Sequence, residues 1–159
     1  MAVAHAGNSP RLVTIHAEGA ASHRGIGPVR LEEPRSTVTR ALGLGRETES
    51  GTQAGETYAG YDYRIGAITL EVGYSNGLVS GVSTHSAHVI LFGHPLSDGL
   101  EVFRHILHGR RGWRIDECHM RAFTALAPGG PGTGIEWKNG RPKLVMIDAG
   151  GVLDDCATL

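Results

Sequence analysis

The stretch that decides the fold is GAITLEVGYSNGLVSGVS, residues 66–83. Ile68, Leu70 and Val72 alternate with smaller or polar residues, which is the period-two pattern of a strand with one buried face. An Asn-Gly pair follows at 76–77, and this pair suits a type I′ turn because both central residues need a positive φ. Apolar residues resume after the turn. The sequence therefore predicts a β-hairpin in this stretch.

A second hairpin of the same kind is predicted further along the chain. TGIEWKNGRPKLVMI, residues 133–147, alternates in the same way around its own Asn-Gly pair, and Tyr74 and Trp137 each stand two positions before the Asn. An apolar patch, a proline and a short helical pattern precede both hairpins in the same order. The repeated order predicts two pseudo-repeats, at about 25–86 and 89–148.

The chain length fits one domain that contains both units. A chain of 159 residues can bury a real core. We expect a single domain over residues 1–159, with a flexible N-terminal arm at 1–10 and a C-terminal tail at 149–159. The predicted fold class is α+β, in which two pseudo-repeated helix-plus-β-hairpin units form an antiparallel sheet with helices on one face.

Composition narrows the possible partners and compartments. The net charge of −1 gives no global electrostatic reason to expect nucleic acid or an anionic membrane. No segment is apolar for long enough to span a bilayer. Residues 1–11 lack a basic start and a continuous apolar stretch, so we expect a cytoplasmic protein, or a secreted one if a signal has been removed. Cys118 and Cys156 are too few for a disulfide scaffold, and both a bridge and free thiols remain open.

Two segments resemble a known group of folds. GIGPVRLEEPRSTVTRALG at residues 25–43 and the later GYSNGLVSGVS resemble the opening and the hairpin of a unit in the β-lactamase-inhibitor-protein/BamE-like group. The resemblance covers about residues 25–148. It implies tandem units with helices on one face of an antiparallel sheet, and a concave face free for a partner. This chain departs from the group at residues 32–34, where Glu-Glu-Pro replaces a Gly and a small apolar residue.

The first functional hypothesis is a protein-interaction module of the inhibitor, immunity or adaptor type, which binds a protein partner through the exposed sheet face. Large aromatic side chains with a polar group dominate binding hot spots. The candidate partner-binding residues are Tyr61, Tyr63, Tyr74, Trp113 and Trp137. The alternative, equally open from the sequence, is that these side chains pack in the core beneath the helices.

The second hypothesis is a small enzyme or ligand-binding protein, such as an isomerase, cyclase or hydrolase, with a small molecule as its ligand. It would have a pocket with convergent polar groups. The side chains that would line the pocket are His85, Asp116, Glu117, Cys118 and His119. Neighbouring residues on a strand point to opposite faces, so we expect neither a metal site nor a cofactor.

Overall fold

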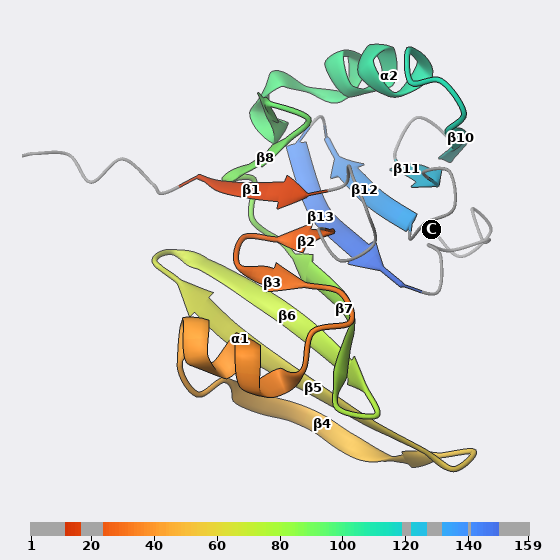
Figure 1. Cartoon of the computed structure of the whole chain (residues 1–159). Helices are drawn as coiled ribbons and strands as arrows, with labels where there is room; N and C mark the ends of the chain where they lie inside the picture. The colour runs from red at the N-terminus through yellow and green to blue at the C-terminus, as the bar shows by residue number, and fades with distance from the viewer. Residues whose placement is uncertain (1–11, 17–23, 119–121, 127–131, 140, 150–159) are drawn as a thin grey trace, which may run out of the picture.

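The computed structural model of the chain describes residues 12–16, 24–118, 122–126, 132–139 and 141–149 (Figure 1). Within these ranges the helices are α1 (Arg35–Leu42), the 3₁₀ helix η2 (Leu96–Asp98) and α2 (Leu100–His108). None of them has the length and hydropathy that crossing a membrane would require. The arm predicted at 1–10 and nearly all of the tail predicted at 149–159 lie outside the described residues.

Nearly half of the described residues belong to one large antiparallel sheet. Its eight strands are, in spatial order, β10 (Arg114–Cys118), β11 (Ala122–Leu126), β12 (Gly132–Lys138), β13 (Arg141–Asp148), β7 (Leu78–Thr84), β6 (Ile68–Ser75), β5 (Glu56–Ile65) and β4 (Arg46–Gln53). Four strands that follow one another in the chain therefore form each half of this sheet. The halves join where β7 pairs with β13.

A second, smaller sheet lies across the large one (Figure 1). Its strands are, in spatial order, β3 (Val29–Arg30), β2 (Gly25–Ile26), β1 (Val13–His16), β8 (Val89–Leu91) and β9 (His94–Pro95). The pairing of β1 with β8 is parallel, and it connects the segment before the first half to the segment before the second.

Both predicted Asn-Gly hairpins are confirmed. β6 pairs with β7, and β12 pairs with β13, each antiparallel across the expected turn. Asn76 and Asn139 have φ values of 50° and 54°, the left-handed conformation that Asn tolerates better than most residues. Because Asn139 follows Asn76 by 63 positions, Ser83 corresponds to Met146, and these two residues pair with each other at the β7–β13 junction.

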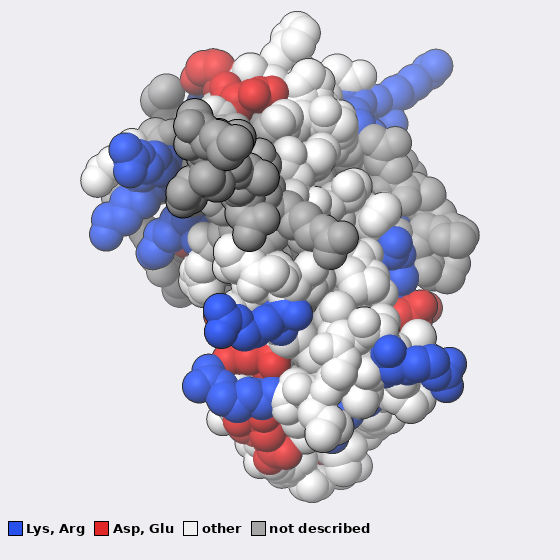
Figure 2. Space-filling view, turned by 90° about the vertical axis from the view of Figure 1, so that its left-hand side faces the viewer, with Lys and Arg blue, Asp and Glu red and all other residues white. Residues whose placement is uncertain are grey.

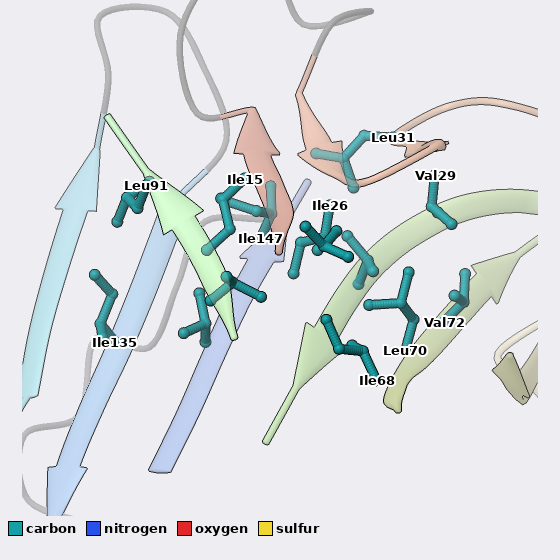
Figure 3. Packing of buried hydrophobic residues seen from close by; sticks show 14 of the residues in the cluster. Ile15, Ile26, Val29, Leu31, Ile68, Leu70, Val72, Leu91, Ile135 and Ile147 are labelled. Carbon is teal, nitrogen blue, oxygen red and sulfur yellow. The ribbon is translucent and has the colours of Figure 1, made fainter. Parts of the chain in front are cut away.

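The core fills the space between the two sheets and beneath the helices. Figure 3 shows Ile26 and Leu31 from the segment around the small sheet directed toward Ile68 and Leu70 of the large sheet. All four side chains are at most 2% exposed. Apolar surface removed from water contributes about 25 cal/mol per Å², so this contact is a principal source of stability.

The predicted fold class is wrong. The described chain is mostly β-structure in two sheets with two short α-helices, rather than an α+β layout with helices on one face of a sheet. Much of the cover over the large sheet is the small sheet, as Figures 1 and 3 show. The pattern indicated an edge strand within residues 11–17, where β1 lies, but the other strands of this layer have only two or three residues, too few for period-two alternation to reveal them.

The polar segment at 45–57 is a second departure, because its composition predicts a loop. It forms β4 and the start of β5, which pair through a turn at Ala54-Gly55 with φ values of 50° and 84°. β4 lies at the edge of the large sheet and is almost entirely exposed. Charged and polar side chains on an edge strand disfavour pairing with another chain, so the polar composition fits this position.

Candidate functional site

The large sheet has one buried face and one open face. Along β6, Ile68, Leu70 and Val72 are at most 1% exposed, whereas Thr69 and Glu71 between them are exposed. Along β13, Val145 and Ile147 are buried in the same alternating way. Side chains at alternate positions of a strand point to opposite faces, so the polar positions together form the open face.

A row of three glycines crosses the open face. Gly60, Gly73 and Gly81 are cross-strand neighbours on β5, β6 and β7. Glu49 pairs with Gly60 at one end of the row, and Asp148 pairs with Gly81 at the other. With neighbouring strands about 4.8 Å apart, the four steps from Glu49 to Asp148 span about 19 Å. This glycine row therefore lies between two carboxylates, with Gly73 at its middle.

Steric crowding explains why two of the three positions in the row are glycine. A Cβ at Gly60 would lie 2.7 Å from Thr48 Oγ1, so a side chain there would require a shift. A Cβ at Gly81 would lie 3.2 Å from Asp148 Oδ2, which is a tight contact. At Gly73 the nearest atom would be 3.5 Å away, an ordinary van der Waals distance. The fold therefore has room for a Cβ at Gly73.

A row of polar residues runs beside the glycines. Asp62, Glu71 and Ser83 are cross-strand neighbours on β5, β6 and β7, followed by Met146 on β13. Ser83 Oγ donates a hydrogen bond of 3.2 Å to Glu71 Oε2. Asp62 accepts an ion-paired hydrogen bond from Arg46. Two carboxylates directly opposite each other repel, so Asp62 and Glu71 make this part of the face favourable for a cation.

Together the two rows line an open hollow of about 520 Å³. We call it the sheet-face hollow; its lining residues include Glu49, Gly60, Asp62, Glu71, Gly73, Gly81, Ser83, Met146 and Asp148. Figure 2, which views the molecule from one side, shows Asp and Glu side chains directly beside Lys and Arg side chains in the lower part. The site can accept a polar, positively charged group, but it is not an enclosed pocket.

Four of the five predicted partner-binding aromatics lie in the core. Tyr61, Tyr63, Tyr74 and Trp137 are 5%, 1%, 3% and 3% exposed. The interpretation in which they face solvent is therefore wrong for these four, because the buried face of the sheet needs large side chains beneath α1 and α2. Trp137 packs on Phe103 of α2 with ring centroids 5.9 Å apart.

The tyrosines form a hydrogen-bonded cluster under α1. The hydroxyls of Tyr63 and Tyr74 lie 3.0 Å apart, and Tyr61 donates a hydrogen bond of 2.5 Å to Glu47 Oε2. The Arg35 guanidinium stacks 3.7 Å above the Tyr61 ring. The hydrogen bond from Tyr61 lowers the pKa of Glu47 and raises the pKa of Tyr61. Burial, reinforced by the hydrogen bond to Tyr63, raises the pKa of Tyr74.

Trp113, the fifth candidate, is partly buried beside α2. Its ring meets the ring of Phe92 edge-on at 5.6 Å, and the Arg110 guanidinium lies 3.6 Å from the Phe92 centroid. Trp113 is thus separated from the sheet-face hollow and does not belong to its lining.

The residues of the predicted enzyme pocket are not brought together along the backbone. His85 follows β7, whereas Asp116, Glu117 and Cys118 lie on β10 at the far edge of the sheet, four strand spacings or about 19 Å away. The side chains of these three residues, and all of His119, lie outside what the structure describes. Among the described residues, no three His, Cys, Asp or Glu side chains gather as a metal site would require.

His85 itself lies at the border of the sheet-face hollow. Its Nε2 is 3.3 Å from Glu71 Oε1, and its Nδ1 is 3.0 Å from the carbonyl oxygen of Lys143. The imidazole therefore connects the two halves of the large sheet.

Comparisons with protein-family models, with curated proteins and with solved structures give no match for this chain. The site must therefore be interpreted from its own chemistry.

The sequence analysis expected a free sheet face but missed the residues that form it, although their signal is present. The polar residues Asp62 and Glu71 stand at alternate positions among the apolar residues of the same strands, and the glycines continue that phase. Following the polar phase of the alternation, rather than the aromatic residues, would have identified the surface.

Proposed function

We propose that this protein is an interaction module that binds a positively charged segment of a protein partner through the sheet-face hollow. The observation that carries the proposal is the juxtaposition of the glycine row with four carboxylates, those of Glu49, Asp62, Glu71 and Asp148. The hollow is open and wide rather than enclosed, which favours a macromolecular partner over a small substrate.

The glycine row supports a side-chain occupant. Because Gly73 has no side chain and its Cβ direction is open, a long extended group such as Arg or Lys can approach the backbone at the middle of the row. The carboxylates would then contact its charged end. A guanidinium pairs well with carboxylates because its planar fork donates two parallel hydrogen bonds.

The chemistry of the face also argues against an apolar partner. Asp62 already pairs with Arg46, whereas burying Glu71 against an apolar surface would leave its charge uncompensated, which costs several kcal/mol. A partner that brings its own cations compensates that desolvation. The proposal therefore keeps the interaction hypothesis from the sequence but replaces its aromatic contacts with polar ones.

Filling the hollow tests the proposal. In Gly73→Tyr the new side chain would occupy the middle of the row, and the open space around Gly73 accommodates its Cβ. Thr52→Tyr is the control, because it adds a tyrosine at an exposed position near the tip of the β4–β5 hairpin. Both variants should retain the thermal stability of the original protein.

The original protein, Gly73→Tyr and Thr52→Tyr are each used to capture partners from the native source, and the captured proteins are identified by mass spectrometry. Binding is then measured for each captured partner and for a synthetic Arg/Lys-rich peptide. We expect Gly73→Tyr to lose both interactions and Thr52→Tyr to keep them. Equal binding by the folded Gly73→Tyr variant would refute the proposal.

A further inference from the structure

The tip of the β12–β13 hairpin places like charges opposite each other. Lys138 and Arg141 are direct cross-strand partners beside the turn, and both are exposed. Like charges at directly opposed positions destabilise a strand pair. This arrangement is therefore unfavourable for the hairpin in the absence of an anion.

A β-bulge adds a third cation. Glu136 pairs with Leu144 and Trp137 pairs with Pro142, which leaves Lys143 as the extra residue of the bulge. A bulge bends its strand and re-aims the side chain that it carries. Lys143 Nζ lies 3.2 Å from Glu136 Oε1, so this ammonium is directed to the same side of the strand pair as Glu136.

The first hairpin provides an internal comparison. It has the same Asn-Gly turn and a bulge at the matching place, between Gly73 and Tyr74. The positions that match Lys138, Arg141 and Lys143 are occupied by Ser75, Leu78 and Ser80. The same backbone thus forms without a cation at any of the three positions, so the hairpin geometry does not require them.

The three cations line a hollow of about 610 Å³, which we call the cationic hollow. Its lining residues are His85, Lys138, Asn139, Arg141, Pro142 and Lys143. The contact of His85 Nδ1 with the carbonyl oxygen of Lys143, at 3.0 Å, fixes the imidazole against the bulge. Among the lining residues, His85 contacts Glu71 and Lys143 contacts Glu136.

We propose that the cationic hollow binds a phosphate-bearing ligand. A phosphate group between Lys138 and Arg141 would relieve their mutual repulsion, and the Arg141 guanidinium can bind two phosphate oxygens at once. Lys143 and Asn139 supply further donors at the rim. This hollow shares no lining residue with the sheet-face hollow, although His85 of the one contacts Glu71 of the other.

The test titrates the full chain with inorganic pyrophosphate at low ionic strength, followed by amide chemical shifts. The triple variant K138S/R141L/K143S installs the residues of the first hairpin, which that backbone already accommodates. We expect saturable shifts around 138–143 in the original protein and binding weaker by about tenfold or more in the variant. The single variant Arg141→Leu, which disturbs the chain least, should weaken binding severalfold.

A charge-matched control separates a built site from general attraction. R40S/R64S/R111S also removes three exposed positive charges, but from α1, β5 and the segment after α2. This variant should keep the affinity of the original protein within about twofold. Equal losses in the two triple variants, an undiminished affinity in K138S/R141L/K143S, or shifts that avoid residues 138–143 would overturn the proposal.

Discussion

The hydroxyl groups of Tyr63 and Tyr74 form a buried pair, and removing both should destabilise the protein less than removing either one. Their oxygens lie 3.0 Å apart, and the two residues are 1% and 3% exposed. Tyr63→Phe removes one partner and leaves the Tyr74 hydroxyl buried without its hydrogen bond. Tyr74→Phe does the same to Tyr63. The double variant removes both polar groups and leaves only the rings.

The magnitudes follow from the cost of an unpaired buried group. Each single variant should lower the free energy of unfolding by about 1–3 kcal/mol, because the remaining hydroxyl stays desolvated without its partner. Replacing both partners with apolar groups of similar shape is nearly neutral, so the double variant should lose only about 0–1 kcal/mol. The coupling between Tyr63 and Tyr74 is then about 1–3 kcal/mol or more.

Urea denaturation of the original protein, both single variants and the double variant measures these quantities in one cycle. Tyr58→Phe is the matched control, because the Tyr58 side chain is 41% exposed and the change should be within about 0.5 kcal/mol. The reasoning is refuted if the double variant loses as much as the sum of the two singles. Such additivity would mean that the hydroxyls contribute independently rather than as a pair.

Two further predictions concern a glycine and a titrating group. Gly25→Ala should lower the free energy of unfolding by more than about 3 kcal/mol, because the new Cβ would lie 1.8 Å from the Val29 carbonyl oxygen. Gly73→Ala is the control and should be tolerated. Thermal unfolding of the two variants measures the difference. Tyr61→Phe should raise the pKa of Glu47, measured by NMR titration of its carboxyl carbon. Because folding lowers the pKa of Glu47, the ionised carboxylate stabilises the fold above its unfolded-state pKa, and this contribution is lost as the pH falls through the folded-state pKa. The variant should therefore lose less stability on acidification.

The hairpins were accessible to sequence reasoning because their determinants are local. The Asn-Gly turns need a positive φ, and the alternating residues beside them identify the buried face without any knowledge of the partner strand. The same alternation correctly gave Ile68, Leu70 and Val72 as core residues. What failed was the assignment of the aromatics, since Tyr63 and Trp137 are large enough to bind a partner and equally suited to fill space under a helix.

The small sheet could not be predicted for a different reason. The parallel pairing of β1 with β8 joins residues 13–15 to residues 89–91, and nothing in either segment specifies a partner so distant along the chain. β4 was missed because its polar composition is typical of a loop. An exposed strand at the edge of a sheet can nevertheless have such a composition. The candidate site depends on cross-strand register, which aligns Gly60, Gly73 and Gly81 only once the strands are paired.

The carboxylates on the open face determine which partners are rejected as well as which are attracted. A neutral partner surface placed over the open face would strip water from Glu71, and from Asp62 and its partner Arg46, without supplying new polar contacts, so desolvation disfavours it. A partner with cations at the right spacing recovers the lost hydration through ion pairs, and the open space at Gly73 lets a cation approach the backbone. The same carboxylates that attract the right partner thus exclude the wrong one, and a difference of affinities of this kind is what specificity requires. Replacing Asp62 and Glu71 by neutral residues should therefore weaken binding of a cationic partner and make binding of a neutral surface less unfavourable.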